Sequence, residues 1–383
     1  MREWIRLLIA GGFYYSGLVK LALWLQQHKG RRLIILNYHQ AGGNLYAQLR
    51  YLRRHYRIMH LEDALSELYA PPRKRQDPRM PLVITFDDGY MDNYVHAFPI
   101  AQKLRIPITI FLIPGFIESG RYFWWLAARY LVQHTLFEKV IIDGRTYQPA
   151  QTRKREALAR AIDARIRYAQ SVTERETLLA QFQIELGMSL PQRSKERMDE
   201  PALPLDWAEI GEMEQSGLVS FGAHTMHHPV LACIADVTEL RYEIEECHRV
   251  LEARLNQPVR TFAYPIGKPE HVGSLALEVV KATGYTWALT TIEAVNTPYT
   301  DPYLLGRLPG DITQHWLVMA AELAGLLGIV SRVKRQKARI SLVRLNRGVG
   351  HMLFNLLNSL FLPRKLLGMA RTPFGPESDQ ERL

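Results

Sequence analysis

The stretch "VITFDDGYMDN", residues 83–93, places two adjacent carboxylates, Asp87 and Asp88, directly after an apolar run. A short apolar run that ends in polar groups is typical of a buried strand in a parallel sheet. Adjacent acids repel each other when both are buried and ionised. The stretch therefore predicts a strand that ends at a site where solvent, a proton or a cation offsets this repulsion.

The same design recurs along the chain. Six short apolar runs share it, and several of them end in His or Asp: residues 33–39, 82–86, 108–113, 218–224, 261–265 and 286–291. Helical patterns lie between them, for example over residues 92–104, 207–216 and 236–255. Strands that alternate with helices predict an α/β fold with a parallel sheet or barrel. In such barrels the reactive residues gather at the carboxyl ends of the strands.

Three regions stand apart from this alternation. We expect residues 116–206, which are rich in Arg and Glu, to form a helical insertion that serves as a lid or side wall of the barrel at 32–310. Residues 1–31 read as an N-terminal apolar and basic helix. Residues 311–383 read as a basic amphipathic extension, in which basic and apolar stretches alternate. Such alternation favours an interfacial membrane segment.

The bulk composition narrows the class of partner. The chain has 383 residues, 47% of them hydrophobic, and a net charge of +10, which suits nucleic acid, an anionic membrane or an acidic polymer. We expect no nucleic-acid partner, because aromatic stacking platforms are nearly absent from the basic tail. Cys233 and Cys247 are expected to be reduced core thiols, because neither sits in a CxxC pair.

The location of the protein is an expectation drawn from its N-terminal region. Residues 7–25 are almost long enough to span a membrane, but Lys20 and a pair of glycines count against a span. A helix on an anionic membrane surface and a helix packed on the protein's own core are both open. The weak signal character and few cysteines favour the cytoplasm or the cytoplasmic face of the membrane, with a secreted or periplasmic location left open.

A second motif complements the two carboxylates. The stretch "GAHTMHHP", residues 222–229, carries His224, His227 and His228 after another predicted strand. Two imidazoles and one carboxylate form a compact site for a divalent metal, with open positions for water and substrate. Each motif alone is weak evidence for a metal site, since adjacent Asp residues most often form a solvated turn. Together, at strand ends of one alternating fold, they predict a metal site.

The motifs together resemble a known family. The stretches "TFDDGYMDN", "HTMHHP" and "FAYPIG" resemble the first three motifs of the polysaccharide deacetylase family (carbohydrate esterase family 4, the NodB-homology domain), and "LNYHQ" is similar to its opening strand. The resemblance covers residues 32–310 apart from the insertion. It implies a distorted (β/α) barrel that uses zinc or a similar divalent ion. Its activity would be removal of N-acetyl groups from sugars of a polysaccharide, oligosaccharide or glycan precursor.

The resemblance also implies a role for each matching residue. Asp88, His224 and His228 would bind the metal, with His228 preferred over His227 because proline follows it. Asp87 would be the general base. The backbone N–H of Ile266 would stabilise the oxyanion, and Gly267 would allow the tight turn there. Tyr264 and Pro265 of the same motif are expected beside the substrate.

Two departures from the family pattern leave roles open. The third motif has Ala263 where many members have an arginine that holds the catalytic aspartate, although Arg260 lies nearby in sequence. The late stretch "LLGRLPGD" has no histidine to serve as general acid. His39 and Arg307 are the candidates for these roles, with a buried strand-end histidine and a surface salt bridge as the plain alternatives. A non-catalytic glycan-binding protein is the alternative function.

Aromatic residues in the insertion suggest a further contact with the substrate. Trp124 and its neighbour Trp125 offer flat rings that suit the apolar faces of sugars. We take Trp124 as a candidate for sugar stacking. The plain alternative is that the pair belongs to the core.

Overall fold

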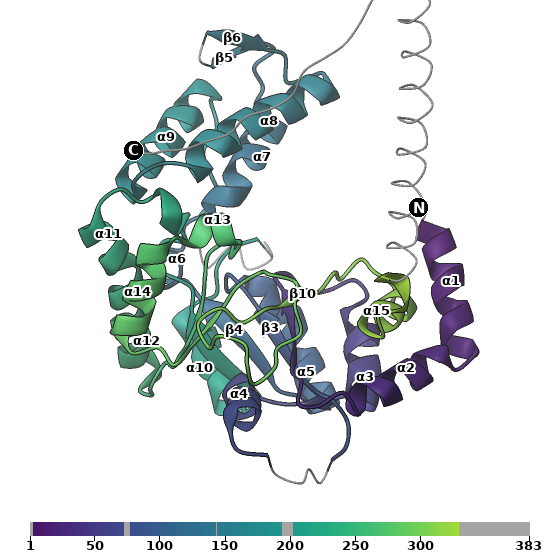
Figure 1. The fold of residues 1–383 in the computed structure, drawn as a ribbon. Coiled ribbons are helices and arrows are strands. Elements are labelled where there is room, and N and C mark those ends of the chain that lie inside the picture. The colour runs from purple at the N-terminus through teal and green to yellow at the C-terminus, as the bar shows by residue number, and fades with distance from the viewer. Residues whose placement is uncertain (1–2, 73–76, 143, 194–201, 329–383) are drawn as a thin grey trace, which may run out of the picture. The chain divides into compact units, whose positions relative to one another are not determined.

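The computed structural model describes residues 3–72, 77–142, 144–193 and 202–328 (Figure 1). The expected membrane-binding stretches beyond residue 328 lie outside the described residues. Within them, the main sheet is eight-stranded, and the neighbours along its path pair in parallel in the order β10-β1-β3-β4-β7-β8-β9. The short strand β2 (Arg57–Ile58) also pairs with β3.

The six strands predicted from the sequence are confirmed. They correspond to β1 (Ile34–Tyr38), β3 (Pro81–Phe86), β4 (Ile108–Leu112), β7 (Val219–Ala223), β8 (Thr261–Ala263) and β9 (Trp287–Leu289). Every residue of β1, β3 and β4 is buried, as expected for parallel strands that are covered on both faces. The apolar runs were therefore a sound signal for the central sheet.

The sheet curls toward closure through one segment. Leu305 forms an isolated parallel bridge with Leu289 of β9. A few residues later, β10 (Leu308–Pro309) pairs with Leu36 and Asn37 of β1. Because this segment contacts both edges, the sheet forms a distorted (β/α) barrel. The carboxyl ends of its strands meet at one mouth.

Helices connect the strands. After β1 come α3 (Leu45–His55) and α4 (Leu61–Tyr69), and after β3 a π-helical turn (Asn93–Ala97) leads into α5 (Phe98–Leu104). Helix α10 (Trp207–Gln215) leads into β7 and begins at a capping box. The later helices are α11 (Val237–Arg241), α12 (Cys247–Leu255), α13 (Pro269–Val272) and α14 (Ser274–Thr283).

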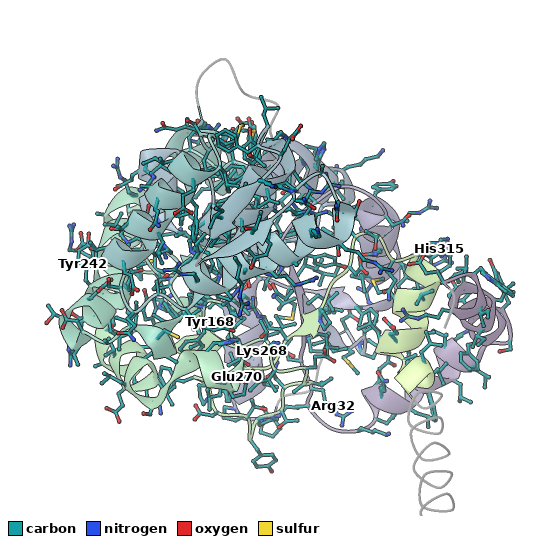
Figure 2. The ribbon with its side chains drawn as sticks, turned by 90° about the horizontal axis from the view of Figure 1, so that it is seen from above. Arg32, Tyr168, Tyr242, Lys268, Glu270 and His315 are labelled. Carbon is teal, nitrogen blue, oxygen red and sulfur yellow. The ribbon has the colours of Figure 1, made fainter. Side chains whose placement is uncertain are left out.

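The described part of residues 116–206 is mostly helical. The helices here are α6 (Pro114–Ser119), α7 (Trp124–His134), α8 (Thr152–Arg167) and α9 (Val172–Glu185), which share a hydrophobic core of their own. The hairpin of β5 (Val140–Ile142) and β6 (Arg145–Tyr147) was not predicted. Just past α8, Tyr168 meets His271 of α13 with ring centroids 6.2 Å apart, which places this end of the insertion against the barrel (Figure 2).

The N-terminal region forms two helices where one was expected. Helix α1 (Glu3–Tyr15) and helix α2 (Leu18–Gln27) meet at Gly17, whose φ of 82° is a left-handed conformation that favours glycine. Tyr14 packs edge-on against Trp316 of α15 (Trp316–Leu323) at 5.0 Å. Among the described helices none is by itself long and apolar enough to cross a membrane. Helices α1 and α2 qualify only as a pair, which is bent by 69°.

Candidate active site

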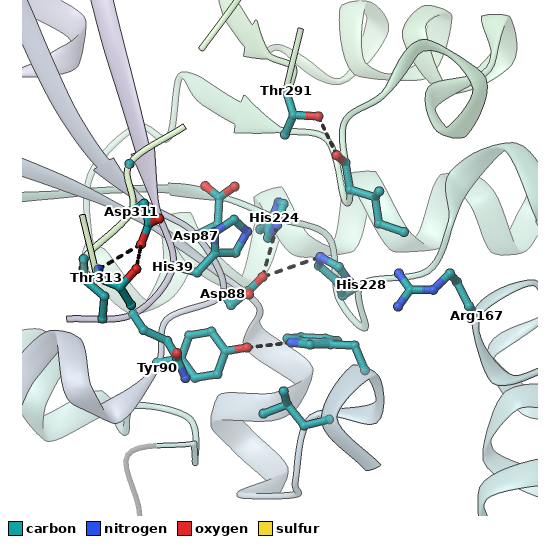
Figure 3. A pocket seen from close by; sticks show the side chains of 16 residues that line it. His39, Asp87, Asp88, Tyr90, Arg167, His224, His228, Thr291, Asp311 and Thr313 are labelled. Carbon is teal, nitrogen blue, oxygen red and sulfur yellow. Dashed lines mark hydrogen bonds and ion pairs between the residues drawn. The ribbon is translucent and has the colours of Figure 1, made fainter. Parts of the chain in front are cut away.

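A pocket of about 630 Å3 opens at the barrel mouth (Figure 3). Side chains that follow several different strands line it, because parallel strands bring their carboxyl ends to the same edge. The insertion supplies part of its wall through Trp125, Leu126 and Arg167. The strand-end residues in its lining include His39, Asp87, Asp88, His224 and His228, together with Ile266.

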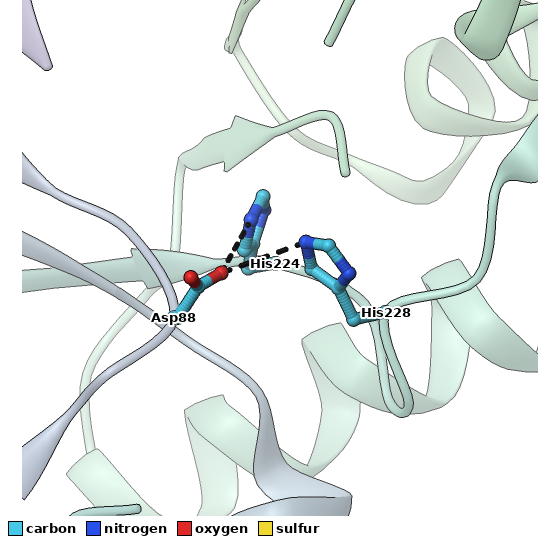
Figure 4. Close-up of side chains that lie close together, drawn as sticks. All are labelled: Asp88, His224 and His228. Atoms are coloured by element: carbon cyan, nitrogen blue, oxygen red, sulfur yellow. Dashed lines mark ion pairs between the residues drawn. The ribbon is translucent and has the colours of Figure 1, made fainter. Parts of the chain in front are cut away.

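Asp88, His224 and His228 form a tight cluster at the base of the pocket (Figure 4). Asp88 Oδ1 lies 3.4 Å from His224 Nε2 and 3.5 Å from His228 Nε2. All three side chains are buried, and no described residue donates a hydrogen bond to Asp88 Oδ1. Three ligands of a tetrahedral zinc ion lie about 3.3–3.6 Å apart, given metal–ligand bonds of about 2.0–2.2 Å. The donor set and the two distances from Asp88 to the histidines therefore fit a divalent metal ion, and all three ligand atoms lie within 4.8 Å of one another.

The backbone around the cluster is held in an uncommon conformation. Asp88, Thr225 and His228 have φ values of 75°, 65° and 55°, in the left-handed region that non-glycine residues seldom adopt. The His228 N–H donates to Thr225 Oγ1 at 2.9 Å, which secures the turn. Such strain persists only where surrounding contacts determine the conformation, and it is concentrated at functional sites.

Each histidine of the cluster presents Nε2 to Asp88. His224 Nδ1 lies 2.7 Å from the Ala263 carbonyl oxygen, so it donates there and leaves Nε2 free as a ligand. Burial acts to lower the pKa of His224, but the carboxylates of Asp88 and Asp87 outweigh it and raise the pKa. Burial, with His224 and Arg175 nearby, lowers the pKa of His228 well below its usual range. His228 is therefore neutral, as a metal-binding imidazole must be.

Asp87 is held by Arg307. The guanidinium donates two hydrogen bonds to the carboxylate, from Nη1 to Oδ1 at 2.6 Å and from Nη2 to Oδ2 at 2.8 Å. Burial acts to raise the pKa of Asp87, but Arg307 opposes it and lowers the pKa to about 2. Arg307 is 1% exposed, so the alternative of a surface salt bridge is wrong. Arg260 instead pairs with Glu62 at the surface.

Ile266 and Gly267 form the turn of the third motif. Both have positive φ, 60° and 65°, and the turn is bound to Thr291, whose hydroxyl donates to the Ile266 carbonyl at 2.7 Å. No described residue accepts a hydrogen bond from the Ile266 N–H, and Ile266 lines the pocket. A Cβ on Gly267 would lie 2.8 Å from Thr291 N, so glycine is required there.

The other two residues of this motif do not face the pocket. Tyr264 and Pro265 are buried, and neither lines the pocket. The Tyr264 ring packs edge-on against Phe262 with ring centroids 5.2 Å apart. The expectation that both residues contact substrate is therefore corrected: they hold the turn from behind.

Trp124 and Trp125 occupy different environments, and the expected sugar contact of Trp124 is not supported. Trp124 is only 1% exposed, and its Nε1 donates to the His228 carbonyl at 3.1 Å, so its ring is not available to a sugar. Trp125 lines the pocket instead, with its ring 4.3 Å from that of His228, and donates to the Tyr90 hydroxyl at 2.6 Å. Successive residues on a helix point in different directions, so only one of the two can face the pocket. The pairing of Trp125 with Tyr90 was not predicted.

His39 and His227, the other two histidines considered for the site, lie in different places: His39 in the pocket and His227 outside the cluster. His39 is exposed and lines the pocket, so the alternative of a buried strand-end histidine is wrong. His227 turns away from the cluster: its N–H and its Nδ1 contact the two carboxylate oxygens of buried Glu243 at 2.8 and 2.6 Å. Arg175 of α9 donates to the His227 carbonyl at 2.9 Å. The insertion thus helps to hold the loop that carries His228.

The fold and the cluster define an α/β-barrel protein with three side chains at its mouth that could hold a metal ion. The sequence profile of the polysaccharide deacetylase family matches residues 74–288, and the chain belongs to this family. The members of this family are hydrolases of carbohydrate esterase family 4. The strand-end residues singled out from the sequence lie within the pocket of this family member.

Individual relatives are more distant. The chain is 32% identical over 98 residues to YxkH of Bacillus subtilis (strain 168), whose name assigns it to the polysaccharide deacetylases; the match covers 24% of this chain and 35% of that protein. IcaB from Ammonifex degensii is 20% identical, with a TM-score of 0.49, and the Streptococcus pyogenes deacetylase PplD, solved with acetate, is 18% identical, with the same TM-score. Each alignment covers 76% of this chain and 97% of the solved one.

Proposed function

We propose that this chain is a metal-dependent hydrolase that removes N-acetyl groups from the sugars of a polysaccharide, oligosaccharide or glycan precursor. One observation carries the proposal. Asp88 Oδ1, which accepts no hydrogen bond from a described residue, faces the Nε2 atoms of His224 and His228. The neighbouring Asp87 is bound by both terminal nitrogens of Arg307. The family is that of the polysaccharide deacetylases, which supports this substrate class.

Asp88, His224 and His228 would hold the ion, and zinc suits one carboxylate with two imidazoles. A divalent ion bound there supplies Lewis acidity and lowers the pKa of a coordinated water. The residues do the rest. The pKa of Asp87, about 2, keeps it ionised at neutral pH, so it enters the reaction as a base that takes a proton from water. Arg307 keeps both carboxylate oxygens in place.

The other pocket residues would complete the site. The free N–H of Ile266 would donate to the oxyanion that forms on the amide carbonyl. His39, whose side chain lines the pocket, would give a proton to the departing amine. Trp125 and Tyr90 would supply an apolar wall, since aromatic rings pack well on the apolar faces of sugars.

Acetate release tests the proposal. The protein loaded with zinc is incubated with N-acetylglucosamine oligomers, and acetate is measured for the wild type and for Asp87→Asn. We expect release by the wild type and a loss of at least about 100-fold in the variant, with metal content retained. Full activity of Asp87→Asn would contradict the assigned mechanism. A non-catalytic glycan-binding protein, the alternative suggested by the missing late histidine, would bind the oligomers and release no acetate.

We further propose that α1 and α2 lie in the interface of an anionic membrane at its cytoplasmic face. Large apolar side chains on this pair are exposed: Trp4, Leu8, Tyr15, Leu18, Leu21, Trp24 and Leu25. Interfacial helices use such aromatic and aliphatic residues, and the cytoplasmic leaflet attracts basic proteins. The packing of Tyr14 on Trp316 supports the rival view that the pair only covers the core.

Pelleting with anionic liposomes separates these two views. Trp4→Glu/Trp24→Glu should release the protein from the vesicles, because both side chains are more than half exposed. Tyr299→Glu is the matched control, since this tyrosine is 97% exposed but lies outside the helix pair. Unchanged pelleting of the tryptophan variant would sink the proposal.

A further inference from the structure

A second cavity, of about 600 Å3, lies between α7 and α8 of the insertion. We call it the insertion groove, lined among others by Trp125, Arg129, Arg155, Arg160 and Arg167. It adjoins the active-site pocket, because Trp125 and Arg167 line both cavities. Each volume lies in the range of ligand pockets, about 300–1,000 Å3. A ligand longer than one sugar that extended from the pocket past Trp125 and Arg167 would therefore reach the groove.

The junction of the two cavities is built to guide such a chain. The Trp125 ring lies beside His228 of the proposed metal cluster. Arg167, at the end of α8, points its guanidinium toward His228 (Figure 3) and is held by Asp163, with Nη2–Oδ1 at 2.9 Å. A sugar chain that extends from the cluster toward the groove would therefore pass the Trp125 ring and the Arg167 guanidinium.

The groove carries more positive than negative charge. Four arginines line it against two acids, Glu156 and Asp163. Arg167 pairs with Asp163 at 2.9 Å, and Arg160 lies 3.9 Å from Glu156. Among the described residues, Arg129 and Arg155 have no acidic partner. Two guanidinium groups are thus left to face the cavity.

A neutral glycan offers these two arginines hydroxyl and amide oxygens but no anionic group to balance their charge. The guanidinium fork matches carboxylate and phosphate oxygens in a bidentate manner. We propose that the insertion groove binds anionic groups of the substrate, so that the glycan carries carboxylates or phosphates near the sugar that loses its acetyl group. This inference rests on the proposed function. The lining that groove and pocket share at Trp125 and Arg167 favours an anionic glycan over any other polyanion, because one chain could then contact both cavities.

Binding and turnover of matched oligosaccharides test the inference. The acidic probes are octasaccharides of hyaluronan and heparosan, in which glucuronate alternates with N-acetylglucosamine, and chitooctaose 1-phosphate. The neutral probe is chitooctaose. Calorimetry gives Kd for each, and acetate release gives kcat and KM. We expect at least one acidic probe to bind about tenfold more tightly than chitooctaose, which corresponds to about 1.4 kcal/mol. The carboxylate and phosphate arms show which anion the groove accepts.

The variant Arg129→Gln/Arg155→Gln should remove this preference. Its Kd and KM for the preferred acidic probe should rise about tenfold, with kcat and chitooctaose binding unchanged and with weaker dependence on salt. Arg153→Gln/Lys154→Gln is the matched control, because it removes two charges from α8 outside the groove. Thermal unfolding checks that both variants are folded.

Three results would overturn the inference. The first is equal affinity of the wild type for all acidic and neutral probes. The second is an equal loss in the control variant, which would show only a general effect of net charge. The third is tighter binding of a single-stranded DNA octamer than of any glycan, which would assign the groove to nucleic acid. Because calorimetry needs no turnover, failure of deacetylation would leave this result readable on its own.

Discussion

Arg307 donates a hydrogen bond to each carboxylate oxygen of Asp87 from a position 220 residues further along the chain. Both side chains are buried, so either charge left unpaired would lower the stability of the fold. Two further donors of the guanidinium are used as well: Nε donates to the Thr290 carbonyl at 2.9 Å and Nη1 to Asn37 Oδ1 at 3.1 Å. Arg307 thus supplies the contact that Ala263, in the third motif, cannot make.

Replacing Arg307 should affect catalysis and stability while sparing the metal site. Arg307→Gln leaves Asp87 buried and unpaired, so we expect unfolding to cost about 3–5 kcal/mol less and acetate release to fall at least about 100-fold. Arg307→Lys keeps the charge but loses the bidentate hydrogen bonds. Its stability and its rate of acetate release should therefore lie between those of Arg307→Gln and the wild type. Denaturant unfolding, acetate release and bound metal are measured together.

A double variant keeps this prediction testable even if Arg307→Gln folds poorly. Asp87→Asn/Arg307→Gln removes both buried charges and should recover part of the lost stability, while remaining inactive. An Arg307→Gln protein with the wild-type rate would show that Arg307 does not position Asp87.

The turn at Gly267 gives a prediction with a clean internal control. Gly267→Ala should destabilise the protein by about 1–3 kcal/mol, because φ is +65° and the new Cβ would lie 2.8 Å from Thr291 N. It should also lower kcat, since Ile266 moves with the turn. Gly211→Ala, inside α10, meets nothing within 4 Å and should be neutral or stabilise by about 0.5–1 kcal/mol. Equal unfolding midpoints for the two variants would refute the strained turn.

Much of this site could be predicted from the sequence, because polar residues that directly follow apolar runs indicate the ends of buried strands. Parallel strands bring their carboxyl ends together, so Asp88 and His224 could be placed in one site without coordinates. The bond between Arg307 and Asp87 could be raised only as one candidate, because it depends on the pairing of β10 with β1. Strand β10 is only Leu308–Pro309, lies between Arg307 and Gly310, and is too short to form an apolar run that predicts a strand.

Other features could not be predicted from the sequence because tertiary packing sets them. The rotation of α7 about its axis decides whether Trp124 or Trp125 faces the pocket, and that rotation is set by packing within the insertion. The break at Gly17 between α1 and α2 interrupts what the composition presents as one apolar stretch. Both depend on tertiary contacts that override local pattern.

Asp92 should make stability depend on pH. It is buried, accepts from Ala41 N at 2.9 Å and from Asn93 Nδ2 at 2.8 Å, and burial raises its pKa to about 7. A carboxyl with a raised folded-state pKa contributes stability that is full below its unfolded pKa, about 4, and is lost as pH rises through 7. The wild type should therefore lose stability from pH 4 to pH 8, by an amount of the order of 2–4 kcal/mol from this group.

Asp92→Asn isolates that contribution, because the variant cannot ionise at this position. Urea unfolding at pH 4 to 8 should give a flatter profile for Asp92→Asn than for the wild type. The variant also loses one acceptor, which lowers its stability by about 1–3 kcal/mol at every pH, so only the difference in slope counts. Parallel profiles would mean that Asp92 keeps an ordinary pKa.

The central claim is that Asp88, His224 and His228 hold the ion on which deacetylation depends, and a metal titration of the apoprotein tests it most directly. Protein stripped with a chelator receives increasing zinc, and acetate release from chitooligosaccharides is followed beside bound metal. We predict that activity rises with zinc and levels off at one ion per chain, while Asp88→Asn binds no stoichiometric zinc and releases no acetate. Full acetate release by the metal-free protein, or wild-type zinc binding by Asp88→Asn, would contradict the account.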